Sequence, residues 1–336
     1  MPTVSVIVPN YNHAKFLKKR LQSILEQTYQ DIEIIYLDDA STDNSHEVFS
    51  EFSDNPKVRE IVNEVNSGSP FAQWNKGIKE ARGEYIWIAE SDDYAHPMFL
   101  ETLISILNNN HRVDLAYCQS NKINEYDQIV EDVHCWTDDL DKKRWHNEFI
   151  SNGLEECRKY LYIKNTIPNA SAVLARTQAF KKIGYADESM RLCGDWMTWI
   201  KILHHADVAF CPKRLNFWRT HPSTVRSDAG ENIQSVYEKM RILSFVHKNV
   251  GIDRKRTGYE NEKLLRKWMS LILRTRERIS LKDNLQIYFC SKSYDPYTDI
   301  RLFKQVGMFL LEKVGDQCRK ITSQYTLLFD SLKKTI

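Results

Sequence analysis

The first 110 residues alternate short apolar runs with segments in which apolar residues recur every three or four positions. The short runs predict buried strands, and the longer spacing predicts amphipathic helices. This alternation is typical of βαβ units with right-handed crossovers and a mainly parallel sheet. The predicted strands are Val4–Val8, Ile32–Leu37, Val58–Val62 and Tyr85–Ala89, and the predicted helices cover residues 14–27, 41–52 and 71–81.

The pattern changes twice further along the chain. From residue 233 onward it is helical, with one apolar face between Leu264 and Leu273 and another between Leu302 and Leu310. We therefore expect an α/β domain over residues 1–232 followed by a helical extension over residues 233–336. Before the extension the pattern is less regular, and it predicts strands at 115–118, 171–174, 208–211 and 215–218 and helices at 154–162 and 196–204.

Polar residues follow three of the predicted strands at their carboxyl ends. They are Pro9-Asn10-Tyr11, Asp38-Asp39 and Asp92-Asp93. In open parallel sheets, ligands bind beyond the carboxyl ends of the strands. The three polar tips are therefore expected to share one crevice.

The third tip carries an unusual density of negative charge, with Glu90, Asp92 and Asp93 inside four positions. A divalent cation bound through oxygen atoms and bridging to phosphates would relieve their repulsion. The alternative is that these residues are turn or helix-capping residues, since His96-Pro97 opens a helix shortly afterwards. Asp38-Asp39 allows the same two interpretations, because a helix dipole or a nucleoside could each use an acidic residue there.

Composition narrows the class of protein. The chain has 336 residues, 42% of them hydrophobic, and seven cysteines without a CxxC pair. An odd number of unpaired cysteines argues against a disulfide framework and a thiolate zinc site, and it favours a reducing compartment. The start MPTVSVIVPNYN does not resemble a signal peptide, and no stretch approaches the ~18 apolar residues of a membrane span. We expect a cytoplasmic protein.

The small net charge hides an asymmetry between the two predicted parts. Residues 1–232 hold 26 Lys/Arg and 34 Asp/Glu, whereas residues 233–336 hold 21 and 11. An acidic first part disfavours a nucleic acid partner. The basic extension has two interpretations: peripheral contact with an anionic cytoplasmic membrane surface, or packing of its apolar faces on the α/β domain or on a second copy in a homodimer.

An ordered set of motifs carries a family resemblance. VSVIVPNYN, DDAS, NSGS, NKGIKEARGEYI and ESDD, followed by CGDW at 193–196 and WRTHPST at 218–224, resemble the inverting family 2 glycosyltransferases with the GT-A fold. The resemblance spans about residues 3–226. It implies a nucleotide-binding half over residues 1–110, an acceptor-binding half over residues 111–232, and a divalent metal cofactor, Mn²⁺ or Mg²⁺.

The resemblance also implies which residues hold the nucleotide. Asp39 matches the aspartate that contacts the base, and Pro9 and Tyr11 line the same pocket. Asp92 matches the residue near the ribose and the metal. The implied donor is a nucleotide-diphospho-sugar, with UDP as the first choice of nucleotide.

Three further positions match the chemical centre of the family. Asp93 matches the principal metal ligand, and Asp195 in GDW matches the catalytic base. His221 matches a histidine near the diphosphate that completes the metal site, although a histidine capping a turn before Pro222 is the alternative. The implied reaction is a single displacement at the anomeric carbon.

Three weaker candidates lie in the same segments. Arg219 pairs with phosphate oxygens or with one of the acidic residues, Trp196 stacks on an acceptor sugar or belongs to the core, and Asn169 is an acceptor-side candidate.

Two departures from the family pattern concern the donor. Glu90 stands where aspartate is common, so we do not expect it to be a ligand. Gln73-Trp74 replaces a basic residue before Asn75, which leaves the diphosphate contact to Arg219 or Lys76.

The sequence thus predicts a metal-dependent inverting glycosyltransferase of the hexosyl type, with a saccharide or lipid-linked acceptor. Its expected setting is the assembly of a bacterial surface polysaccharide or glycolipid, an expectation that rests on family analogy. A sugar-nucleotide pyrophosphorylase is the first alternative, but PNYNHAKFL lacks the glycine-rich loop of that class. A non-catalytic sugar-nucleotide-binding protein is the second, and the presence of Asp195 disfavours it.

Overall fold

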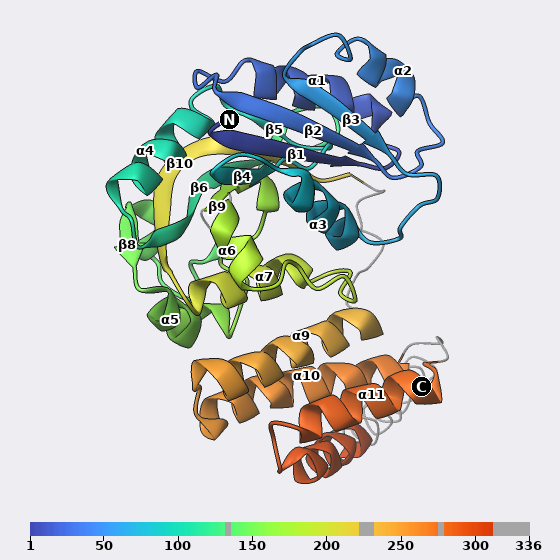
Figure 1. Cartoon of the computed structure of the whole chain (residues 1–336). Helices are drawn as coiled ribbons and strands as arrows, with labels where there is room; N and C mark the ends of the chain where they lie inside the picture. The colour runs from blue at the N-terminus through green and yellow to red at the C-terminus, as the bar shows by residue number, and fades with distance from the viewer. Residues whose placement is uncertain (132–135, 222–231, 275–278, 312–336) are drawn as a thin grey trace, which may run out of the picture.

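A central β-sheet with helices on both faces stands on a bundle of C-terminal helices (Figure 1). The computed structural model describes residues 1–131, 136–221, 232–274 and 279–311. The last three residues of WRTHPST and the end of the predicted extension, residues 312–336, lie outside the described residues. None of the described helices is long and apolar enough to cross a membrane.

The sheet has ten strands, eight of them in the order β3-β2-β1-β4-β9-β6-β10-β5. Parallel pairing joins β3, β2, β1 and β4, and it joins β6 to β10. β9 runs antiparallel between β4 and β6, so six strands share one direction and the predicted α/β fold with a mainly parallel sheet is confirmed. The strands are β1 (Val4–Asn10), β2 (Ile32–Asp38), β3 (Val58–Val62), β4 (Tyr85–Ile88), β5 (Tyr94–Ala95), β6 (Val113–Ile123), β7 (Ile129–Glu131), β8 (Phe149–Ser151), β9 (Val173–Arg176) and β10 (Asp207–Arg219).

Two hydrophobic clusters cover the two faces of the sheet. One packs α1 and α4 against β1, β2 and β4, and the other packs α3, α6 and α7 on the opposite face and continues into α9 and α10. A further helix covers residues 298–311. The other helices are α1 (Ala14–Leu25), α2 (Ser45–Ser50), α3 (Pro70–Glu80), α4 (Phe99–Asn109), α5 (Gly153–Glu156), α6 (Thr177–Lys182), α7 (Gly194–Leu203), α9 (Ile233–Phe245), α10 (Arg254–Arg274) and α11 (Leu281–Lys292).

The predicted elements of the first half match the structure to within a few residues. In the second half two predictions differ from the structure, and β7, β8 and α6 are not among the predicted elements. The two strands predicted at 208–211 and 215–218 are one strand, β10, whose register shifts between Cys211 and Arg214. Pro212 lies in this irregular stretch, where a residue without a backbone N–H is tolerated. The strand predicted at 171–174 begins only at Val173, because residues 170–172 form a 3₁₀ turn.

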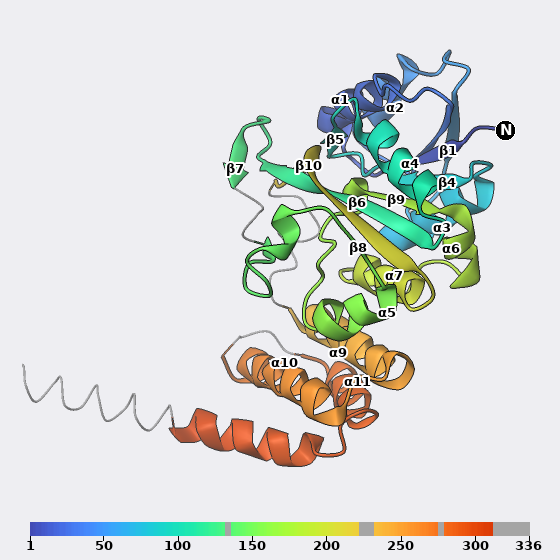
Figure 2. The ribbon, with the colours of Figure 1, turned by 90° about the vertical axis from the view of Figure 1, so that its left-hand side faces the viewer.

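The C-terminal helices pack on the α/β domain, as one of the two interpretations of the extension predicts. Val236, Met240 and Leu243 of α9 belong to the same buried cluster as Trp199 of α7. The apolar face of α10 is buried at Leu265 and Trp268, whereas the face on residues 298–311 is largely exposed. Figure 2 shows this last described helix on the side of the bundle away from the sheet.

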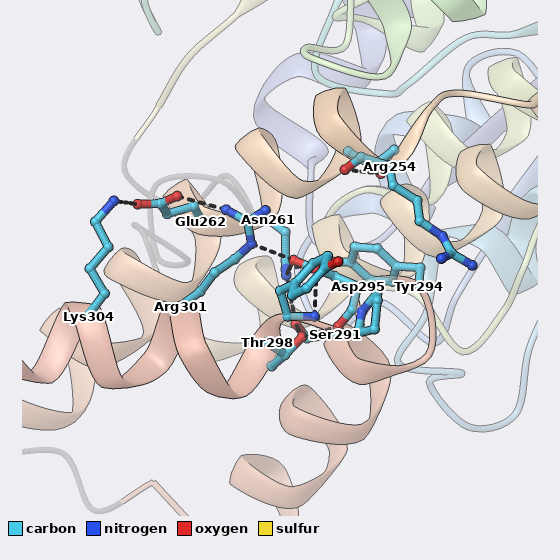
Figure 3. A network of polar contacts seen from close by, with 12 residues as sticks. Arg254, Asn261, Glu262, Ser291, Tyr294, Asp295, Thr298, Arg301 and Lys304 are labelled. Carbon is cyan, nitrogen blue, oxygen red and sulfur yellow. Dashed lines mark hydrogen bonds and ion pairs between the residues drawn. The ribbon is translucent and has the colours of Figure 1, made fainter.

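Buried polar side chains fasten the bundle together (Figure 3). Asn261 of α10 donates to Ser291 Oγ and Asp295 Oδ2 at 2.9 and 2.8 Å, and its own oxygen accepts from Tyr294 at 2.6 Å. Arg301 on the last described helix forms an ion pair with Glu262 of α10 at 2.8 Å. Because buried polar groups are costly without partners, these contacts fix how α10, α11 and the last described helix meet.

A buried carboxylate on α9 connects the C-terminal helices to the α/β domain. Glu238 of α9 accepts hydrogen bonds from the backbone N–H groups of Arg191, Leu192 and Cys193 at 2.7, 2.9 and 2.7 Å. Its side chain is fully buried. Charge-assisted hydrogen bonds of this kind are stronger than neutral ones. The segment just before α7 is therefore held in place by the C-terminal helices.

We expect Glu238→Gln to lower the free energy of unfolding by about 2–4 kcal/mol, because an amide NH₂ group would face N–H donors that lose their acceptor. Chemical denaturation followed by tryptophan fluorescence measures the change. Glu26→Gln, at an exposed position, is the control and should stay within about 0.5 kcal/mol of the parent protein. Equal unfolding free energies for the two variants would show that the bridge does not stabilise the fold.

Candidate functional site

The three polar tips lie together at the carboxyl edge of the sheet. Asn10 pairs with Asp38 in the register of β1 and β2, and its Nδ2 donates to Asp38 Oδ1 at 3.0 Å. Ala89 follows β4 beside β1, and its backbone N–H donates to Ile7 O at 2.8 Å. Because neighbouring parallel strands end at one edge, the residues that follow them lie along the same edge of the sheet.

Asp39 shapes the loop that follows β3. Its carboxylate accepts hydrogen bonds from Asn63 Nδ2 at 2.6 Å, from Ser67 N and Oγ at 2.9 and 2.7 Å, and from Gln73 Nε2 at 2.9 Å. Of the two residues expected beside it, Pro9 is buried within β1, whereas Tyr11 is 46% exposed. Asp39 thus connects β2 to the NSGS loop.

The counter-charge for the acidic tip is a buried arginine on α1. Arg20 is fully buried; its Nε donates to Glu90 O at 2.8 Å, and its Nη2 lies 4.0 Å from Asp93 Oδ2. Burial lowers the pKa of Arg20 to about 10. Burial together with the charge of Asp92 raises the pKa of Asp93 to about 6 and that of Glu90 to about 8. The repulsion among these carboxylates is therefore only partly offset.

Asp93 is held from within the protein. Its Oδ1 accepts from Arg219 N at 2.8 Å, and its Oδ2 accepts from Asn169 Nδ2 at 2.9 Å. The side chain is 2% exposed. Asn169 itself accepts a hydrogen bond from Asn216 of β10 at 3.2 Å. Asp93 therefore ties β10 and the segment before β9 to the acidic tip.

Asp92, by contrast, faces two imidazoles. His221 Nε2 lies 3.3 Å from Asp92 Oδ2, and potential ligand atoms of His13, Asp92 and His221 all lie within 4.8 Å of one another. Burial would raise the pKa of Asp92, but the hydrogen bond with His221 and the charge of His13 hold it below the usual value. Burial lowers the pKa of His13, which favours the neutral, ligating form of its imidazole.

This group of side chains fits a divalent metal ion. Two imidazoles and one carboxylate suit a first-row transition-metal ion better than Mg²⁺, which prefers oxygen ligands. His13 Nδ1 is hydrogen-bonded to Ser91 Oγ at 2.8 Å, so the ring is oriented by a second contact, as is usual for metal-binding histidines. The described residues thus contain a possible His/Asp metal site.

Asp195 lies in the first turn of α7, between two cavities. It is 7% exposed, and its Oδ2 accepts a hydrogen bond from Asn165 Nδ2 at 3.1 Å. One cavity, of about 210 Å³, is also lined by the acidic tip and His13. The other, of about 540 Å³, opens toward the C-terminal helices. Asp195 lines both, so a single carboxylate can act on groups bound in either.

The weaker candidates have defined positions. The guanidinium of Arg219 is held by three hydrogen bonds within the protein. Its Nε donates to Asp92 O at 2.7 Å, its Nη1 to Asn124 O at 2.7 Å and its Nη2 to Asp127 Oδ1 at 2.5 Å. The ion pair with Asp127 corresponds to the acidic-partner alternative for this residue. Trp196 is buried but lines the larger cavity, and its Nε1 donates to Leu161 O at 2.7 Å.

Three site residues are not among the sequence candidates: His13, Arg20 and Arg191. Arg191 is exposed, lines the smaller cavity, and reaches toward Gly68 of the NSGS loop, where its Nη2 is 3.4 Å from the position that a Cβ would take. Lys76 contacts Asn63 instead of lining either cavity. In the sequence, only position could have pointed to two of these residues. His13 lies just beyond the first polar tip, and Arg191 lies four residues before Asp195.

The acidic tip gives a prediction for metal-free protein. A carboxyl group whose pKa is raised on folding stabilises the fold at low pH, and this contribution is lost as pH rises through the folded-state value. For Glu90 the loss extends from pH 4.5 to about 8. We expect the melting temperature in chelator to fall between about pH 5.5 and 8, and to fall less in Glu90→Gln, which keeps an acceptor for Trp74 Nε1. An equal fall in Glu90→Gln and in the exposed control Glu26→Gln would contradict this.

Comparison with known proteins identifies relatives of this chain. The chain is 29% identical over 244 residues to an uncharacterized glycosyltransferase of Rickettsia typhi, covering 71% of this chain and 70% of that protein. It is 44% identical over 100 residues to glycosyltransferase GlyG of Streptococcus pneumoniae, covering 30% and 33%. Among solved structures, S. aureus TarS residues 1–349 in complex with UDP-GlcNAc superposes with a TM-score of 0.66 at 17% identity, covering 91% of this chain and 89% of that one, a likeness of fold.

The family model described as glycosyl transferase family 2 matches residues 5–184, more than half of the chain. This range contains β1 to β4, the NSGS loop and the acidic tip. Together with the GT-A-like arrangement of the sheet and the glycosyltransferase relatives, the match shows that the chain belongs to glycosyl transferase family 2.

Proposed function

We propose that the protein is a metal-dependent inverting glycosyltransferase that moves a sugar from a nucleotide-diphospho-sugar to an acceptor hydroxyl. The observation that carries this proposal is the position of Asp195, which lines both cavities and shares the smaller one with Asp92 and His13. A base between two binding spaces, with a possible cation site in one of them, is the arrangement that direct displacement needs.

The smaller cavity is assigned to the sugar and diphosphate of the donor. His13, Asp92 and His221 would hold the metal ion, which when bound stabilises negative charge on the diphosphate. Arg191 lines the same cavity and can donate to phosphate oxygens. Pro9, Tyr11 and Asp39 are assigned to the nucleoside, and the complex of TarS with UDP-GlcNAc supports a uridine nucleotide.

Asp92, and not Asp93, is the proposed metal ligand of the acidic tip. Both oxygens of Asp93 already accept hydrogen bonds, from Arg219 N and Asn169 Nδ2. Asp92 carries the oxygen that faces the two imidazoles. We assign Asp93 and Asn169 to positioning, because they connect the acidic tip with β10.

Asp195 is assigned to the acceptor. Its carboxylate would take the proton of the accepting hydroxyl while that oxygen forms a bond to the anomeric carbon from the face opposite the leaving group. The bond from the anomeric carbon to the diphosphate oxygen breaks in the same step, and the nucleoside diphosphate leaves. Attack from the opposite face inverts the anomeric configuration. Asn165, which donates to Asp195 Oδ2, orients the carboxylate.

A cellular role is proposed on analogy alone. Bacterial relatives and a basic, helical C-terminal part support a place in the assembly of a surface polysaccharide or glycolipid, with a saccharide or lipid-linked acceptor at the cytoplasmic face of the membrane.

Removing the proposed carboxylate ligand should abolish metal-dependent chemistry. With Mn²⁺ and a panel of UDP-, GDP- and dTDP-sugars, we expect slow release of nucleoside diphosphate that chelation stops and that Asp92→Asn reduces about 100-fold, because the leaving group loses its stabilising cation. A coupled assay for the released nucleotide measures the rate. Asp54→Asn, at an exposed position, is the control. Release that is insensitive to chelation would sink the metal assignment.

The proposed base gives a separate prediction. Asp195→Asn should bind the donor nucleotide as the parent protein does, while transfer to an acceptor falls by about 10²–10⁴-fold, because the amide cannot accept the hydroxyl proton. Calorimetry measures nucleotide binding, and analysis of glycosylated products measures transfer. Transfer that survives in Asp195→Asn at more than a tenth of the parent rate would show that another group is the base.

A further inference from the structure

The larger cavity is built jointly by the α/β domain and the C-terminal helices. Its volume is about 540 Å³, more than twice that of the donor-side cavity. Asp195 and Leu192 line both spaces. A molecule bound in the larger cavity can therefore present a hydroxyl group to Asp195. The C-terminal helices contribute to the wall of a space that includes the proposed base.

The charge of this wall is positive. Two of its lysines have carboxylate partners: Lys263 pairs with Glu260 at 2.9 Å, and Lys164 pairs with Asp139 at 3.0 Å. Lys239 of α9 forms no ion pair with any described residue. An excess of positive charge along a cleft attracts an anionic ligand. Among the residues that line the cavity, four are lysines (Lys164, Lys239, Lys263 and Lys267) and two are carboxylates (Asp195 and Glu260).

Burial adds to the effect of the charge. Lys239 and Lys267 are both partly buried, and they come from different helices, α9 and α10. Burial lowers the pKa of Lys267, so its ammonium group has lost part of its hydration. An anion bound beside Lys239 would interact with these positive charges at short range.

Aromatic side chains form another part of the wall. Trp136, Tyr162 and Trp196 line the cavity. The two indoles are fixed by hydrogen bonds, Trp136 Nε1 to Asn165 O at 2.8 Å and Trp196 Nε1 to Leu161 O at 2.7 Å. Fixed aromatic rings offer flat apolar surfaces to sugar or polyol units. The wall therefore combines contacts for a saccharide with cations.

We propose that the larger cavity binds the acceptor and that this acceptor is anionic, carrying a phosphate or a carboxylate close to the hydroxyl that receives the sugar. The proposal rests on the proposed function, since it takes Asp195 as the base. Lys239 binds the anionic group, the charge of Lys267 adds to the positive field around it, and Trp136 and Trp196 contact the saccharide or polyol. The basic character of α9 and α10 then serves acceptor recognition.

Calorimetry tests the proposal on full-length protein whose donor side is saturated with UDP and Mn²⁺. The probes are glucose 6-phosphate, glucuronate and neutral glucose. We expect at least one anionic probe to bind about ten-fold or more tightly than glucose, and Lys239→Gln/Lys267→Gln to remove that preference. Tighter binding of the phosphate identifies a phosphorylated acceptor, and tighter binding of glucuronate identifies a carboxylated one.

Lys255→Gln is the matched control, because Lys255 is an exposed lysine of α10 that does not line the cavity. It should keep the full preference. Lys239→Gln alone is tested in parallel, so that the proposal stays open to refutation if the double variant does not fold. Equal affinity of the parent protein for all three probes, or a preference that survives in both Lys239 variants, overturns it. Donor hydrolysis by the parent protein distinguishes this failure from failure of the proposed function, which alone predicts nucleotide release.

Discussion

The site depends on one buried cation, Arg20, placed beneath three carboxylates at the end of β4. The fully buried guanidinium donates to Glu90 O and lies 4.0 Å from Asp93, so the acidic tip is fixed from below by α1. Burial, together with the charge of Asp92, raises the pKa values of Glu90 and Asp93, so Arg20 only partly offsets the cost of placing these carboxylates in the interior. The negative charge of the acidic tip is therefore not fully compensated within the protein. A divalent ion bound at Asp92 would add positive charge there.

Buried carboxylates also accept hydrogen bonds from backbone N–H groups and so fix the position of several segments. Asp39 organises the NSGS loop, Asp93 accepts from the backbone of Arg219, and Glu238 accepts from three consecutive N–H groups before α7. Each connects segments that are far apart in the sequence. Arg191 and the residues just before α7 are therefore held by a helix of the C-terminal extension. If Asp195 is the base, as proposed, the extension contributes to the catalytic unit.

The sequence was sufficient for the strand–helix alternation and for the common edge at which the polar tips lie, because these follow from local periodicity and from the geometry of parallel strands. It did not show which of Asp92 and Asp93 has both carboxylate oxygens hydrogen-bonded within the protein. Adjacent side chains point in different directions, and which one is satisfied internally depends on Asn169 and Arg219, 76 and 126 residues away. His13 and Arg191 escaped notice for the same reason: single residues gain meaning only when distant segments meet.

Under the proposed function, the two cavities that Asp195 lines place different demands on positive charge. At the donor side, negative charge grows on the leaving group as the bond breaks, so a cation there acts on the rate of the step. The lysines of the larger cavity line the space on the acceptor side, where the anionic group of an acceptor has the same charge before and during the reaction. They would therefore strengthen the binding of substrate and transition state alike, which lowers the acceptor KM without raising kcat.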